Sequence, residues 1–146
     1  MITVKYPVAL AAVFLWIGFV CAISFMEAWL KFRAPGITVP LGLGIGRLVF
    51  HALNKMEWVF AVAILVNMLF AGYTPKWSHL FFVLPLLLLA IQTAWLLPAL
   101  DARAEMHIQG LKVPSSNKHF IYVAMEALKV IALLIFGLTL FKHTTP

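Results

Sequence analysis

Apolar residues along the chain fall into four long runs, separated by short stretches that carry most of the charge. The runs cover residues of about 8–30, 46–71, 80–100 and 119–141. A helix that spans a bilayer needs about 20 predominantly apolar residues, so each run predicts one membrane span. Little sequence remains outside the runs. We therefore expect a single transmembrane domain over residues 1–146, with no soluble module.

Composition supports the same class of protein. The chain is 64% hydrophobic and 11% charged, with a mean hydropathy of +1.01, whereas soluble domains are about 25% charged. The first run is longer than the apolar region of a signal peptide, and no small-x-small cleavage site follows it. The prediction is an all-α integral membrane protein, with four transmembrane helices in a bundle and the lipid bilayer as its main partner.

The net charge of +6 indicates topology rather than nucleic-acid binding, because the basic residues are spread along the edges of the runs. Six of them belong to the side of the bundle that carries the first and third loops: Lys31, Arg33, Arg47, Arg103, Lys112 and Lys118. Three belong to the other side: Lys5, Lys76 and Lys142. The positive-inside tendency places loops 31–45 and 101–118 in the cytoplasm and both termini outside, as in a protein of a bacterial inner membrane.

Short similarities between the two halves predict an internal repeat. AISFMEAWL (22–30) matches AIQTAWL (90–96), GITVP (36–40) matches GLKVP (110–114), and HALNKME (51–57) matches HFIYVAME (119–126). The matches come in the same order, which favours two parallel helical-hairpin repeats over residues 8–71 and 80–141. Between the first two runs, Pro35, Pro40 and the glycines of LGLGIG (41–46) predict a turn-rich or re-entrant loop rather than helix.

Polar side chains open the second run, in RLVFHALNKME (47–57). At about 100° per residue, Arg47, His51 and Asn54 share one stripe of a helix, and Lys55 and Glu57 flank that stripe. With a rise of about 1.5 Å per residue, Glu57 lies inside the hydrocarbon, in the half of the bilayer nearer the cytoplasmic loops.

The other three runs place polar residues in the same half of the bilayer. Ionisable residues cost about 2.5–3.5 kcal/mol each at mid-membrane on insertion scales, so they face inward and pair. We expect one polar pocket, open to one side and centred on Glu57 and Glu126, that binds an amphipathic or lipophilic small molecule. The candidate ligand-binding residues are Glu27, Arg47, His51, Asn54, Glu57, Asp101, His119, Tyr122, Glu126 and Lys129.

In a second class of function, the same cluster of polar residues binds no ligand and only holds the helices together. Interhelical polar contacts stabilise membrane bundles by about 0.6 kcal/mol each on average, so these residues are also typical of an accessory or assembly subunit. Both classes fit a homo-oligomer or a subunit of a membrane complex. Proton-coupled transport is a further alternative, for which four spans are few unless the chain oligomerises.

The histidines and acids lack the spacing of a familiar metal centre. The Glu-x-x-His pattern of di-iron bundles is absent, and Glu105 and His107 are two residues apart in an expected loop. No metal site is therefore predicted. A haem held by His51 and His119 is an alternative, because both histidines lie at one membrane face on helices of the two repeats.

Arg47, Asn54 and Glu57 in RLVFHALNKME resemble the second-helix motif of the membrane-associated eicosanoid and glutathione metabolism family. The resemblance covers residues 47–57 only. It implies glutathione as a cofactor bound by these three residues between the subunits of a trimer, and a thiol-dependent transferase or isomerase acting on a lipophilic substrate. Over its whole length, the chain looks more like the many four-span proteins of bacterial inner membranes.

Overall fold

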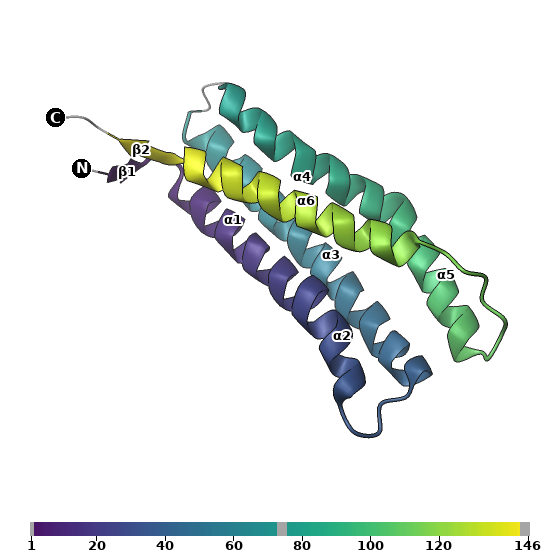
Figure 1. Ribbon diagram of the computed structural model, residues 1–146. Helices are drawn as coiled ribbons and strands as arrows, with labels where there is room; N and C mark the ends of the chain where they lie inside the picture. Colours follow the sequence, from purple (N-terminus) through teal and green to yellow (C-terminus); the bar gives the residue numbers. More distant parts are fainter. Residues whose placement is uncertain (1, 73–75, 144–146) are drawn as a thin grey trace.

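The computed structural model describes residues 2–72 and 76–143, and within them four helical spans form an elongated bundle (Figure 1). The first span, Pro7–Arg33, consists of α1 (Pro7–Val20), η1 (Cys21–Glu27), α2 (Ala28–Leu30) and η2 (Lys31–Arg33). The second is α3 (Val39–Phe70). The third, Trp77–Ile108, consists of η3 (Trp77–His79), α4 (Leu80–Ile91), η4 (Gln92–Leu96) and α5 (Leu97–Ile108). The fourth is α6 (Lys118–Thr139).

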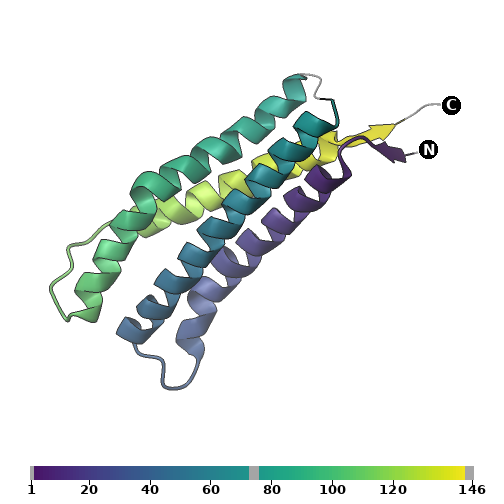
Figure 2. The ribbon, with the colours of Figure 1, turned by 180° about the vertical axis from the view of Figure 1, so that it is seen from behind.

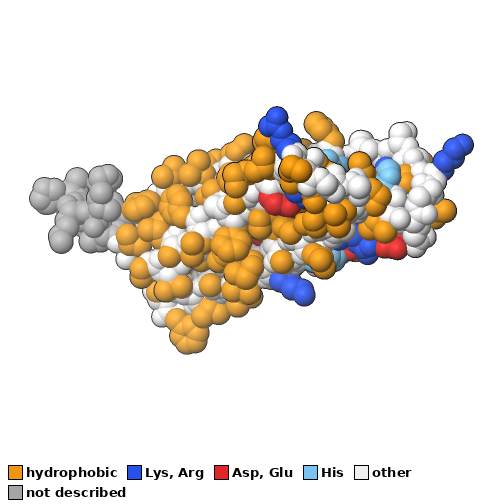
Figure 3. All heavy atoms as spheres, turned by 90° about the horizontal axis from the view of Figure 1, so that it is seen from below, with side chains coloured by type: hydrophobic (Ala, Val, Ile, Leu, Met, Phe, Trp, Pro, Cys, Tyr) orange, Lys and Arg blue, Asp and Glu red, His pale blue; other side chains and the backbone are white. Residues whose placement is uncertain are grey.

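The spans pack as two hairpins side by side. α1 contacts both α3 and α6, α4 contacts α6, and α3 contacts α5, an arrangement that Figure 2 shows from behind. Trp16, Leu53, Leu133 and Phe136 have no exposed surface and lie at the centre of the core. Large apolar side chains cover the outer surface (Figure 3). Each span is long and apolar enough to cross a bilayer, so the all-α four-span prediction is confirmed and the chain is a multi-pass membrane protein.

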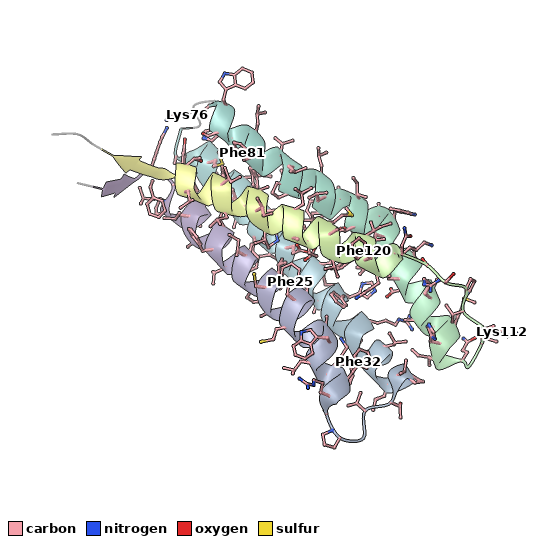
Figure 4. The ribbon with its side chains drawn as sticks, viewed as in Figure 1. Phe25, Phe32, Lys76, Phe81, Lys112 and Phe120 are labelled. Atoms are coloured by element: carbon pink, nitrogen blue, oxygen red, sulfur yellow. The ribbon has the colours of Figure 1, made fainter. Side chains whose placement is uncertain are left out.

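Both termini lie at one end of the bundle, where β1 (Ile2–Val4) pairs antiparallel with β2 (Phe141–His143) (Figure 1). The side chain of Lys142, used in the topology prediction, lies outside the described residues. We call the opposite end, which holds residues 34–38 and 109–117, the loop end. Figure 4 shows Phe32 and Lys112 at the loop end and Lys76 at the other.

The helices extend beyond the predicted spans at the loop end, and the expected re-entrant loop before residue 47 is wrong. α3 begins at Val39, because Pro40 suits a first helical turn and the Thr38 hydroxyl accepts a hydrogen bond from the Leu41 amide at 3.4 Å. The expected loop around Glu105 and His107 is also wrong, since both residues belong to α5. Lengthened helices carry the polar residues out to the loop end on continuous backbone.

Two glycines of α3 allow side chains of the first span to approach closely. A Cβ atom at Gly42 would overlap the Phe32 ring, and one at Gly46 would lie 3.2 Å from Nζ of Lys31. Both glycines are buried, whereas a Cβ atom at Gly44 would meet nothing within 4 Å. The small residues at positions 42 and 46 therefore fix where Lys31 and Phe32 lie.

Replacing Gly42 by Ala is expected to lower the free energy of unfolding by about 1–3 kcal/mol, the usual cost of overpacking, because the Phe32 ring must move. Gly44→Ala is the matched control and should leave stability equal or slightly higher, since Ala favours helix by about 1 kcal/mol over Gly. Thermal unfolding of both variants in detergent, followed by circular dichroism, tests this. Equal unfolding midpoints for the two variants would show that the Phe32 ring can move aside without a loss of stability.

Each half of the chain also contains one π-helical segment, η1 in the first span and η4 in the third. These segments overlap the matched stretches AISFMEAWL and AIQTAWL. Wide turns of this kind often occur at functional sites. Their equivalent positions accord with the predicted duplication, which stays a prediction.

Candidate ligand cavity and buried charge network

Charged side chains gather toward the half of the molecule away from the termini, on the face that Figure 3 shows. They form two separate groups rather than the single cluster that we expected. One group is fully enclosed by the four spans at the level of Glu57 and Glu126. The other lines a cavity near the loop end.

The enclosed group, here called the inner network, contains Trp16, Ser24, Glu57, Gln92, Glu126 and Lys129. Nζ of Lys129 donates to Oε1 of Glu57 at 2.5 Å and to Oε1 of Glu126 at 2.7 Å. Its third hydrogen bond goes to Oε1 of Gln92 at 2.5 Å. An ammonium group has three donors, so all three are used, and the exposed fraction of Lys129 is 0%.

Three further contacts tie the two carboxylates to the surrounding helices. Oε1 of Glu57 accepts from Nε1 of Trp16 at 2.8 Å. Oε2 of Glu126 accepts from the Ser24 hydroxyl at 3.0 Å, and Oε1 of Glu126 accepts from Nε2 of Gln92 at 2.6 Å. Ser24 and Gln92 come from η1 and η4 and take the same place in the two matched stretches. The π-helical turns thus present two equivalent donors to one carboxylate.

An aromatic layer lies between the inner network and the loop end. Phe50 and Tyr122 meet edge to face with ring centroids 5.2 Å apart. The exposed fraction of Tyr122 is 2%, while Phe50 also lines the cavity. These two rings separate the enclosed charges from the outer group.

The cavity near the loop end, here called the outer cavity, has a volume of about 230 Å³ and takes residues from all four spans. Most of its wall is apolar, from residues such as Phe32, Leu43, Phe50, Leu97 and Leu100. Its ionisable lining residues are Lys31, Arg47, Asp101, Arg103, His107 and His119.

The lining carries three permanent cations and one carboxylate. Lys31, whose side chain is only 10% exposed, pairs with Glu27 at 3.1 Å. Arg47 pairs with Glu105 and, at 3.6 Å, with Asp101. Among the described residues, Arg103 forms no ion pair. The outer cavity therefore offers cationic donors beside an apolar wall.

Among the other predicted site residues, Glu27, His51 and Asn54 fall outside the cavity lining and the inner network. Asn54 donates to the Thr93 hydroxyl at 2.9 Å, and Trp58 donates to the same oxygen at 3.0 Å. His51 is exposed and pairs with Asp101, whereas His119 lines the cavity. The described residues contain no group of three or more His, Cys, Asp or Glu side chains placed to hold a metal.

Several residues of these sites were not among the predicted ones. Trp16, Ser24 and Gln92 complete the inner network, and Lys31 and Arg103 supply cations to the outer cavity. The Glu27–Lys31 spacing of four residues was a usable sequence signal, because such a pair meets on one face of a helix. Trp16 and Ser24 gave no such signal within an apolar run.

The three residues that carry the family resemblance take part in three different sets of contacts within the chain. Arg47 belongs to the outer cavity, Asn54 to the Thr93 group and Glu57 to the inner network. Comparison of the chain with protein-family models, curated proteins and solved structures gave no match.

Proposed function

We propose that this protein binds an amphipathic small molecule with an anionic headgroup in the outer cavity. The observation that best supports this proposal is the lining of the cavity. Lys31, Arg47 and Arg103 border a space whose other walls are mostly apolar. Lys31 is held nearly buried, which makes hydrogen bonds from its ammonium group stronger than in water. Arg103 has no competing ion pair among the described residues.

The size of the cavity limits how the ligand is held. Pockets for drug-sized ligands have volumes of about 300–1,000 Å³, so a space of about 230 Å³ takes a phosphate or carboxylate headgroup and only a few methylene groups. The rest of an acyl or prenyl chain would lie between the helices or in lipid. With the topology that we propose from the basic loops, the headgroup enters from the cytoplasmic side.

Dodecyl phosphate is a suitable probe because it combines a phosphate with a single apolar tail. We expect it to bind the protein in uncharged detergent, with dodecyltrimethylammonium not competing for the site. Lys31→Met should weaken binding by about 10–100-fold, since a hydrogen bond to a charged group contributes about 1.5–3 kcal/mol. Equilibrium dialysis with labelled probe measures this directly.

Lys55→Met is the matched control, because Lys55 is an exposed lysine of α3 that does not line the cavity. Its affinity for the probe should equal that of the unaltered protein. Inorganic phosphate in excess distinguishes the source of the headgroup, since competition by phosphate alone indicates a site that does not need the tail. Equal losses in the two lysine variants, or no binding at all, would reject the proposal.

A further inference from the structure

The inner network has an uneven charge count. It contains two carboxylates, Glu57 and Glu126, and one ammonium group, Lys129, each with an exposed fraction of 0%. With all three groups ionised, one negative charge remains without a counter-ion in an enclosed site. A buried charge without a partner is costly, and one added proton makes the network neutral.

The two carboxylates differ in the number of hydrogen bonds that they accept and in which of their oxygens accept them. Glu126 accepts three hydrogen bonds, and both of its oxygens have donors. Both donors to Glu57, Trp16 and Lys129, go to its Oε1. Oε2 of Glu57 is buried with no hydrogen-bond partner among the described residues. The unpartnered oxygen is therefore the place where an added proton removes the most unfavourable charge.

The predicted repeat accounts for the imbalance in the sequence. Glu57 and Glu126 occupy matching positions in HALNKME and HFIYVAME. Three residues further on, the second half carries Lys129 whereas the first half carries Phe60. Each half thus supplies one acid, but only one half supplies a cation, and Lys129 pairs with both acids.

We infer that the inner network is a proton-binding site, which holds one exchangeable proton on Oε2 of Glu57. Every packed element places a polar group in it: Trp16 from α1, Ser24 from η1, Glu57 from α3, Gln92 from η4, and Glu126 and Lys129 from α6, with Tyr122 of α6 beside it. The Tyr122 side chain interacts with Ser24 and also packs on Phe50 of the outer cavity. Tyr122 therefore lies between the inner network and the outer cavity. The proton site does not depend on which ligand the outer cavity binds.

Infrared spectroscopy of the purified full-length protein at neutral pH tests the proton directly. A protonated carboxyl group gives a carbonyl stretch above the amide I band, and the stretch shifts on exchange into deuterium oxide. We expect one such band per chain in the unaltered protein. The band should disappear in both Glu57→Gln and Glu126→Gln, because each variant leaves one carboxylate matched to Lys129. It should persist in Glu105→Gln, a control at an acid paired outside the network.

Two milder variants locate the proton. Trp16→Phe removes a donor from Oε1 of Glu57 and should shift the carbonyl band. Ser24→Ala removes a donor from Glu126 and should leave the position of the band unchanged. A shift in Ser24→Ala alone would place the proton on Glu126 and overturn the assignment to Glu57. The absence of the band from the unaltered protein would overturn the proton site itself, whether or not any variant folds. Persistence of the carbonyl band in a folded Glu57→Gln protein would also overturn the proton site.

Discussion

Replacing Lys129 by Met is expected to lower the free energy of unfolding by about 3–5 kcal/mol, the usual cost of removing one partner of a buried ion pair. Lys129 forms three hydrogen bonds within the inner network, and neither it nor the two carboxylates are exposed to solvent. Without the ammonium group, the carboxylate of Glu126 is left in an enclosed site with no counter-ion. Chemical unfolding in mixed micelles gives the free-energy difference.

A triple variant separates charge from packing in this prediction. Glu57→Gln and Glu126→Gln, combined with Lys129→Met, make the network neutral while keeping similar side-chain volumes. Replacement of a whole buried ionic group by neutral residues is often neutral or stabilising, so the triple variant should recover most of the lost stability. If the triple variant is as unstable as Lys129→Met alone, the loss comes from the packing of the lysine chain and not from its charge.

Trp16→Ala should produce a loss of similar size, about 3–5 kcal/mol for deleting a buried Trp side chain. The exposed fraction of Trp16 is 0%, and its indole lies where α1 meets the core. Its Nε1 also donates to Glu57. The substitution therefore leaves a cavity and removes one of the two donors to that carboxylate. Chemical unfolding of the variant measures the combined effect.

Trp16→Phe is the matched control, because Phe fills much of the space but cannot donate a hydrogen bond. It should cost about 1–3 kcal/mol, the penalty of leaving a buried acceptor short of a donor. In a Glu57→Leu background the cost of Trp16→Phe should shrink, because Leu offers no acceptor to the Trp16 indole and the hydrogen bond is already lost. An unchanged cost in that background would mean that the hydrogen bond from Trp16 to Glu57 contributes nothing.

The four spans and their all-helical class follow from the sequence because hydrophobic run length decides both. Runs of about 20 apolar residues leave a bilayer-spanning helix as the structure that satisfies every backbone polar group within one segment. The convergence of Glu57, Glu126 and Lys129 also follows from the sequence, since ionisable residues at one depth of neighbouring spans must face inward. The structure brings these three side chains into direct contact.

The division of the polar residues into two sites was not predictable from helical periodicity. Asn54 and Glu57 are only about 60° apart on α3, yet Asn54 contacts Thr93 and Glu57 contacts Trp16. The π-helical segments η1 and η4 change the angle between successive residues, so an ideal 3.6-residue period does not bring Ser24 and Gln92 to Glu126. Tertiary packing, not local sequence, decides which of these side chains meet.

The stretch between the first two spans also adopts a structure that local sequence did not predict. The glycines and prolines between residues 35 and 46 are typical of turns, but α3 starts at Val39 and runs through Gly42, Gly44 and Gly46. Close packing of Phe32 against Gly42 and of Lys31 against Gly46 accounts for two of these glycines. Their role is close approach between helices rather than chain reversal.

Native mass spectrometry of the protein released gently from its own membrane tests the central claim most directly. We expect one anionic, lipophilic adduct per chain in the unaltered protein. The adduct should be lost in a Lys31→Met/Arg103→Met variant and retained in Lys55→Met, because Lys31 and Arg103 line the outer cavity and Lys55 does not. A bare unaltered protein, or equal adduct occupancy in all three proteins, would contradict the claim that the outer cavity binds such a molecule.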